Sequence, residues 1–289
     1  MDNRYQGQKP LNRPYLLLTP GPLTSSDRVK RAMLSDWCTW DDDYNINIVQ
    51  TIRRELLELA QVDPAIYTNV LLQGSGSYCV EAAVTNIVGA DDKLLIIANG
   101  AYGERINKTA EYAKLNATAI ILGETEQVTP ELVKQALGND PSITHVAVVH
   151  CETTTGILNP LAQIAQVVKD ADKVFIVDAM SSFGGIPINM QQLGIDALIS
   201  SANKCIQGVP GFGFIILRRD IMAKCKGRSR TLSLDIFDQW DQMEKGNGKW
   251  RFTSPTHVVR AFAEALSELR QEGGIEARYA RYVASPTRV

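Results

Sequence analysis

The stretch Phe175-Ile-Val-Asp178-Ala-Met-Ser-Ser182 decides the fold class, together with Ser200-Ser-Ala-Asn-Lys204-Cys-Ile-Gln-Gly208 further along the chain. The first is an apolar strand that ends on a carboxylate, and the second is a run of small residues that ends on a lysine before a turn. The distance between the two polar residues, 204 − 178 = 26 positions, leaves room for a short crossover and one more strand. We therefore expect both groups at strand ends of an α/β sheet.

Apolar strands alternate with helical segments on both sides of this stretch. Such alternation is typical of crossover units and predicts a largely parallel sheet with helices on both faces. The expected strands are 70–72, 94–98, 118–122, 145–152, 173–178, 197–201 and 211–217, and the expected helices are 25–34, 45–62, 101–115, one beginning at Thr129-Pro130, 161–170 and 254–273. Ligands of such sheets bind at the carboxyl ends of strands, where Ser75, Glu152, Asp178 and Asn203 are predicted to lie.

The segment Gln73-Gly-Ser-Gly-Ser77 joins a predicted strand to a predicted helix. Free backbone N–H groups and the positive end of the helix dipole at such a junction suit a phosphate. The segment lacks the Gly-Lys-Ser/Thr of a nucleotide-binding loop, and Cys79 stands where a dinucleotide fingerprint needs its third glycine. A phosphate site is thus favoured over a plain turn.

The composition excludes several classes of protein. The formal net charge of −2 gives no reason to expect a nucleic acid or an anionic membrane as partner, and no apolar run approaches the length of a membrane span. The polar start Met1–Pro10 lacks the apolar core of a signal peptide. An odd number of cysteines, five, without paired spacing predicts free thiols and a cytoplasmic location.

Two further motifs are ambiguous from the residues alone. Thr19-Pro-Gly-Pro22 is a rigid, non-helical elbow whose simplest interpretation is a connecting loop. The acidic run Asp41–Asp43 could hold a divalent cation, but no further ligands at suitable spacing support a metal site. No nucleophile–histidine–acid order or Gly-x-Ser-x-Gly motif favours a hydrolase.

The motifs taken together resemble the class V aminotransferase family of fold-type I pyridoxal phosphate (PLP) enzymes, and the resemblance covers residues 15–282. It rests on segments 18–24, 36–45, 73–77, 99–103, 150–156, 177–182, 201–205 and 251–257. The block Asp36-Trp-Cys-Thr-Trp-Asp-Asp-Asp-Tyr-Asn45 is similar to the branch of the family that acts on a phosphonate substrate.

This resemblance implies roles for named residues. Lys204 would hold PLP through a Schiff base and then act as general base and acid, and Asp178 would pair with the pyridine nitrogen. The remaining implied contacts are Ser75, Gly76 and Ser77 at the phosphate, Tyr102 on the ring face, Thr153 or Thr155 at the ring oxygen, Thr253 at the phosphate of a partner subunit's cofactor, and Thr19, Pro20 and Gly21 at the substrate entrance. A homodimer is therefore expected.

The implied reaction transfers the amino group of 2-aminoethylphosphonate to pyruvate, giving phosphonoacetaldehyde and alanine. The alternatives are another small-substrate aminotransferase of the family (alanine–glyoxylate or serine–pyruvate) and an inactive remnant that still binds PLP. The expected division is an N-terminal segment with the elbow over 1–40, a large PLP-binding domain over 41–255, and a linking helix with the start of a small domain over 256–289. Family members continue into a domain that carries a carboxylate-binding arginine, so a C-terminally truncated chain is expected, in which Arg278, Arg281 and Arg288 cannot be assigned that role by position.

Overall fold

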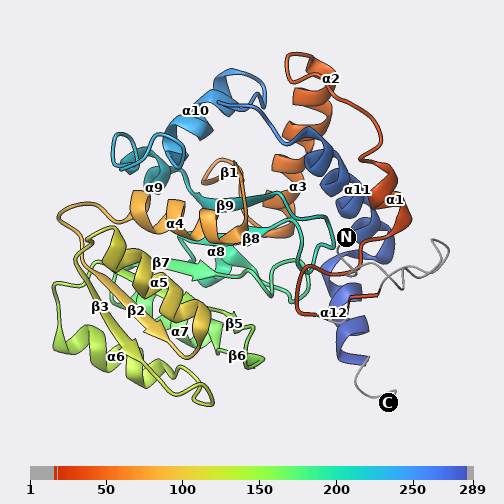
Figure 1. Ribbon diagram of the computed structural model, residues 1–289. Coiled ribbons are helices and arrows are strands. Elements are labelled where there is room, and N and C mark those ends of the chain that lie inside the picture. The colour runs from red at the N-terminus through yellow and green to blue at the C-terminus, as the bar shows by residue number, and fades with distance from the viewer. Residues whose placement is uncertain (1–15, 18, 285–289) are drawn as a thin grey trace, which may run out of the picture.

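The computed structural model describes residues 16–17 and 19–284. Within them, seven strands form one sheet in the order β1-β9-β8-β7-β4-β2-β3, and a small hairpin, β5-β6, lies beside it (Figure 1). The strands of the sheet are β1 (Tyr67–Gln73), β2 (Leu94–Ala98), β3 (Ala117–Ile121), β4 (His145–Val149), β7 (Val174–Asp178), β8 (Ala197–Ser201) and β9 (Phe212–Arg218); those of the hairpin are β5 (Cys151–Glu152) and β6 (Ile157–Leu158). The one continuous strand predicted over 145–152 is thus divided into β4 and β5.

The direction of the strands places the polar residues at one edge. All neighbours pair in parallel except β9, which runs antiparallel to both β1 and β8. The carboxyl ends of the other strands, and the beginning of β9, therefore lie at the same edge of the sheet. The predicted, mostly parallel sheet is confirmed, while the reversed direction of β9 was not predicted.

Thirteen helical segments lie within the described residues. They are α1 (Asp27–Arg31), α2 (Asp42–Tyr44), the π-helix η2 (Asn45–Gln50), α3 (Thr51–Leu59), α4 (Gly76–Ile87), α5 (Ala101–Tyr112), α6 (Pro130–Asn139), α7 (Leu161–Asp170), α8 (Met190–Leu193), α9 (Arg219–Lys224), α10 (Ile236–Lys245), α11 (Thr256–Glu272) and α12 (Gly274–Ala284). The helix expected over 45–62 is thus a π-helical turn followed by α3. The short helix expected to reach Leu34 ends at Arg31.

Local sequence explains where several helices begin and end. The Ser26 hydroxyl accepts a hydrogen bond from Val29 N at the start of α1, and Thr129 does the same for Leu132 N at the start of α6, whose first residue is Pro130. Helix α11 ends at Glu272, and the residue that follows it, Gly273, adopts φ +108°, a left-handed conformation that glycine reaches without steric cost.

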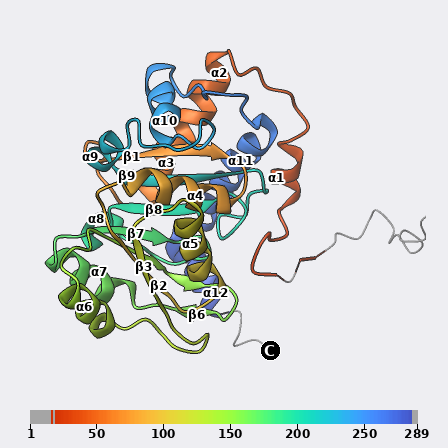
Figure 2. The same ribbon diagram turned by 60° about the vertical axis from the view of Figure 1, so that its left-hand side comes forward.

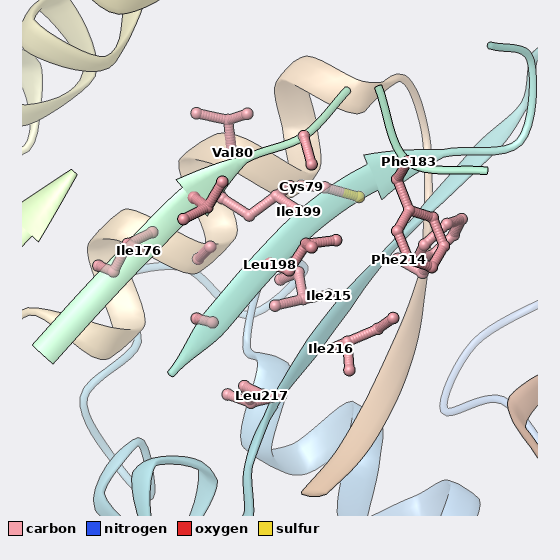
Figure 3. Packing of buried hydrophobic residues seen from close by; sticks show 14 of the residues in the cluster. Cys79, Val80, Ile176, Phe183, Leu198, Ile199, Phe214, Ile215, Ile216 and Leu217 are labelled. Atoms are coloured by element: carbon pink, nitrogen blue, oxygen red, sulfur yellow. The ribbon is translucent and has the colours of Figure 1, made fainter. Parts of the chain in front are cut away.

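Helices cover both faces of the sheet, as predicted. Successive side chains of β9 point to opposite faces. On one face Gly213 lies so close to Cys79 of α4 that a Cβ would be 2.6 Å from its sulfur. On the other face Phe212 packs edge-on against Phe262 of α11, with ring centroids 5.1 Å apart. Figure 3 shows the apolar side chains of β7, β8 and β9 next to Cys79 and Val80.

The elements that follow β1 and β2 meet above one face. Helix α4 packs across β8 and β9, α5 packs across β2, and the two helices contact each other, so that they lie side by side in both ribbon views (Figures 1 and 2). This arrangement brings the first turn of α4 near the first turn of α5.

The N-terminal segment that the structure describes runs beside α11. The Ser26 hydroxyl donates to Glu268 Oε1 at 2.5 Å, and Arg28 Nη1 donates to Gln271 Oε1 at 2.7 Å. The polar start Met1–Pro10 and Arg288 lie outside the described residues. Among the helices described, none is both long enough and apolar enough to cross a membrane.

Candidate active site

A pocket of about 400 Å³ opens at the edge where the strand ends meet. Its size falls within the range of small-molecule sites, roughly 300–1,000 Å³. Segments that follow β1, β2, β7 and β8 and the segment that precedes β9 line it: Gly74, Ser75, Gly76, Ser77, Val80, Tyr102, Arg105, Asp178, Met180, Ser201, Asn203, Lys204, Pro210 and Gly211. The topology therefore gathers the residues that the sequence had separated by more than a hundred positions.

Asp178 ends β7 at the bottom of this pocket. Only 3% of its surface is exposed, and its carboxylate accepts a hydrogen bond from Met180 N at 2.9 Å. The pKa of Asp178 is raised to about 6, mainly by burial and also by the nearby Glu152, whereas the hydrogen bond from Met180 N and the charges of Arg105 and Lys204 act in the opposite direction. An anion in this position is stabilised by any cationic N–H group that enters the pocket.

Lys204 follows β8 and reaches the same pocket. A tight turn holds its backbone, because Gln207 N donates to Lys204 O at 2.8 Å and Gly208 N donates to Ala202 O at 2.9 Å. Partial burial lowers the pKa of the Lys204 amine. A lowered pKa increases the fraction of neutral amine, which is the form that can act as a nucleophile or a base.

The Gln73–Ser77 segment forms the predicted helix junction. Ser75 is the N-cap residue of α4, in extended conformation, and its side chain makes no capping hydrogen bond. Gly74 adopts φ +117°, which favours glycine there. The first N–H groups of α4 have no acceptors within the helix, so they and the two serine hydroxyls can receive a phosphate.

Tyr102 lies at the start of α5, where Glu152 holds the backbone. The Glu152 carboxylate, fully buried, accepts from Tyr102 N at 2.9 Å and from Gly103 N at 3.3 Å. Gly100 leaves the space for it, because a Cβ there would be 2.3 Å from Glu152 Cγ. Glu152 was predicted at this edge of the sheet, but its contact with Tyr102 was not predicted.

Arg105, one turn further along α5, was not predicted as a site residue. Its guanidinium carbon lies 4.7 Å from the centroid of the Tyr102 ring, and its Nη1 donates to the Ser77 hydroxyl at 3.2 Å. The sequence does carry one signal for Arg105: it lies three residues after Tyr102 on a predicted helix, and residues three apart share a helix face.

The elbow lies directly against the lysine. A Cβ at Gly21 would be 2.7 Å from Lys204 Nζ, so the backbone of the elbow forms one boundary of the space around that amine. Thr19 donates its hydroxyl hydrogen to Pro22 O at 2.8 Å. Thr19, Pro20 and Gly21 are not among the lining residues of the pocket, and their contact with substrate stays a prediction.

The three predicted threonines lie in different places. Thr153 and Ser181 share a hydrogen bond between their hydroxyls, which ties Thr153 to the loop that follows Asp178. Thr155 instead accepts from Ile157 N at 3.4 Å within the β5–β6 turn. Thr253 is exposed and lines a neighbouring cavity, which shares Gly74 with the pocket. None of the three lines the pocket itself.

Two arginines of α12 lie near the site but do not enter it. Arg278, 2% exposed, donates to Cys205 O at 2.8 Å and pairs with Glu272 at 2.7 Å. Arg281 also pairs with Glu272, at 2.6 Å. Arg278 therefore supports the turn that carries Lys204.

A buried carboxylate and a lysine at the carboxyl end of a mostly parallel sheet, with a helix N-terminus beside them, define the class of fold-type I PLP-dependent enzymes. The residues fit the cofactor: among the residues that the structure describes, none gives Asp178 the cationic hydrogen-bond partner that a ring N–H would supply, and the α4 N-terminus offers N–H groups to a phosphate. Residues 44–282 match the family model described as Aminotransferase class-V. The chain belongs to the class V aminotransferase family, whose members depend on PLP.

Curated relatives support this assignment. The chain is 63% identical, over 93% of its length and 75% of the relative, to a 2-aminoethylphosphonate–pyruvate transaminase of Bacteroides fragilis. It is 58% identical, over 95% of its length and 75% of the relative, to the protein of the same name from Vibrio cholerae. Among solved structures, the pyridoxamine–pyruvate aminotransferase of Mesorhizobium loti superposes with a TM-score of 0.85 at 25% identity, covering 94% of this chain and 69% of that one.

Proposed function

We propose that this chain transfers the amino group of 2-aminoethylphosphonate to pyruvate and thereby forms phosphonoacetaldehyde and alanine. The observation that carries the proposal is the convergence of Asp178 and Lys204 on one pocket with the N-terminus of α4. The names of relatives at 58–63% identity support the choice of substrates.

The cofactor supplies an electron sink for the carbon from which a proton is removed. Lys204 Nζ moves that proton, and burial favours this role because it lowers the pKa of the amine. The Asp178 carboxylate holds a proton on the cofactor's ring nitrogen, since an anion at this buried position favours a cationic partner. The Tyr102 ring covers one face of the pocket, and Ser75, Gly76 and Ser77 bind the phosphate.

Thr153 is the better candidate of the two threonines for the ring oxygen. Its hydroxyl is already directed to Ser181 in the loop that follows Asp178, whereas the Thr155 hydroxyl is used within its own turn. Thr19, Pro20 and Gly21 form the substrate entrance in this proposal, because Gly21 lies against Lys204.

We further propose that the enzyme is a homodimer in the cytoplasm. Large apolar side chains are exposed around the cavity that Thr253 lines, among them Tyr78 at 55% and Phe252 at 51%. A second copy that covers this surface would place Thr253 near the phosphate of its partner's cofactor. The cysteines of the described residues are all unpaired, which fits a reducing compartment.

The test is a comparison of the wild-type chain with Lys204→Ala after incubation with PLP. The wild type is expected to develop a visible absorption band and to release phosphonoacetaldehyde from 2-aminoethylphosphonate in a single turnover, and pyruvate is then expected to yield alanine. Lys204→Ala should lack the band and lose about 10⁴-fold in rate, because the proton carrier is gone.

Lys224→Ala is the matched control, since Lys224 is an exposed lysine on α9, beyond the opposite end of β9. It should behave like the wild type. A band that survives in Lys204→Ala would contradict the assigned lysine, and a wild type that accepts alanine or serine but not the phosphonate would contradict the assigned substrate.

A further inference from the structure

We propose that Arg105 is a positioning residue that joins the aromatic wall of the pocket to the phosphate-binding turn of α4. The inference rests on the proposed function, because it concerns the same cofactor site. Arg105 contacts the Tyr102 ring through its guanidinium group and Ser77 through one N–H group, and both partners line the pocket.

The contact with Tyr102 determines how the ring is held. Glu152 fixes the backbone of Tyr102 but not its side chain. The Arg105 guanidinium lies 4.7 Å from the ring centroid, a geometry in which a planar cation attracts an aromatic face. Because the ring is half-buried, this contact restricts the rotations that would move it away from a cofactor.

The contact with Ser77 connects two separate elements. Ser77 belongs to the first turn of α4 and Arg105 to α5, and the hydrogen bond of 3.2 Å between them is a side-chain link between the two helix starts. As the acceptor from Arg105, the Ser77 oxygen leaves its hydroxyl hydrogen free to be donated to a phosphate oxygen. The guanidinium thus orients the hydroxyl and also adds positive charge near the bound anion.

Arg105 differs from the other basic residues nearby. Lys108, Lys114 and Arg230 line an adjacent surface cavity of about 500 Å³ but do not line the cofactor pocket, whereas Arg105 lines both. Its charge also acts on the reacting groups: burial is the main cause of the shifts, and Arg105 adds to the lowering of the Lys204 pKa and opposes the raising of the Asp178 pKa.

The experiment compares Arg105→Gln, Arg105→Lys and the control Lys108→Gln in the chain of residues 1–289. PLP and pyridoxal, which lacks the phosphate, serve as two probes, and their affinities are measured by the visible absorption and circular dichroism of the bound forms. Arg105→Gln should weaken PLP binding by about tenfold and pyridoxal binding by only about threefold, since the charge and the oriented hydroxyl act mainly on the phosphate, whereas the contact with Tyr102 serves both probes. Arg105→Lys should recover part of the charge effect but not the stacking.

A double mutant tests the link itself. If Arg105 acts through Ser77, then Ser77→Ala and Arg105→Gln should be non-additive for PLP affinity, and visible circular dichroism should change in both Arg105 variants. Lys108→Gln should change neither readout.

Unchanged PLP affinity and dichroism in Arg105→Gln would overturn the inference, as would strictly additive effects with Ser77→Ala. A wild-type protein that does not bind PLP at all would instead refute the proposed function. Should Arg105→Gln fail to fold, the visible circular dichroism of Arg105→Lys decides the question: a changed signal supports the inference and an unchanged signal overturns it.

Discussion

The bottom and the rim of the pocket are built in different ways. At the bottom, Asp178 is buried, as is Glu152 behind the lining residue Tyr102, and backbone N–H groups hold both carboxylates. At the rim, Ser77 and Arg105 are exposed and hold each other through side chains. The bottom is therefore fixed by the fold of the main chain, whereas the rim depends on contacts that water can replace.

Because of this difference, substitutions at the bottom and at the rim should have different effects on folding stability and on cofactor binding. A buried carboxylate that loses its partners carries a large desolvation cost, so changes at the bottom should affect folding and the reaction together. Exposed side-chain contacts contribute little to folding. Changes at the rim should therefore affect cofactor affinity with little effect on stability.

The largest expected effect is on catalysis in Asp178→Asn. The amide keeps the shape but removes the negative charge that holds a proton on the cofactor's ring nitrogen, so the transamination rate should fall by about 10³-fold. Single-turnover kinetics with 2-aminoethylphosphonate measures this loss. A decrease of less than tenfold would mean that the bottom of the pocket does not act on the cofactor's electronics.

The stability of the cofactor-free protein should depend on pH through the same residue. The folded-state pKa of Asp178, about 6, lies above its ordinary value of 3.8, so its stabilising contribution is complete below about pH 4 and is lost as pH rises through 6. About 2 pKa units correspond to about 3 kcal/mol. Urea unfolding at pH 5 and pH 8 should show that Asp178→Asn gains stability relative to the wild type at the higher pH. If the two proteins differed in free energy of unfolding by the same amount at both pH values, the raised pKa of Asp178 would be contradicted.

A moderate loss of folding stability is expected when the buried carboxylate of Glu152 is removed. Glu152→Ala leaves the N–H groups of Tyr102 and Gly103 without their acceptor and opens a cavity, so the free energy of unfolding should fall by about 2–3 kcal/mol. Glu152→Gln keeps one acceptor oxygen and should lose about half as much. Denaturant unfolding distinguishes the two, and equal losses would show that the hydrogen bonds are not the cause.

The smallest effect on folding is expected at the rim. Ser77→Ala should change the free energy of unfolding by less than about 0.5 kcal/mol, because Ser77 is exposed, yet it should weaken PLP binding measurably. Thermal unfolding of the cofactor-free protein together with a PLP titration tests both parts. A large loss of stability in Ser77→Ala would show that contacts at the rim contribute to folding as those at the bottom do.

The sequence predicted the bottom of the pocket better than the rim. Asp178 and Lys204 follow apolar strands, and strand ends in an α/β sheet gather at one edge, so local patterns were sufficient for them. Arg105 lies on an exposed helix face, and its contact with Ser77 depends on the packing of α4 against α5, which no local pattern encodes. Glu152 was placed at the correct edge, but its acceptor role depends on where α5 begins.

The direction of β9 is a feature of the fold that local sequence patterns likewise do not predict. An apolar run such as Phe212–Leu217 predicts a buried strand but carries no information on its direction, because both faces are buried in either case. The π-helical turn Asn45–Gln50 likewise keeps the apolar spacing of an α-helix. Both features are set by contacts with distant parts of the chain.

Arg278 has a mechanical consequence for the lysine. It binds the carbonyl of Cys205, the residue after Lys204, although the two lie 73 positions apart. Helix α12 therefore acts as a brace on the peptide that carries the reacting amine. A displacement of α12 that broke this hydrogen bond would free the turn from Lys204 to Gln207 and shift the amine without any change in the pocket's own residues.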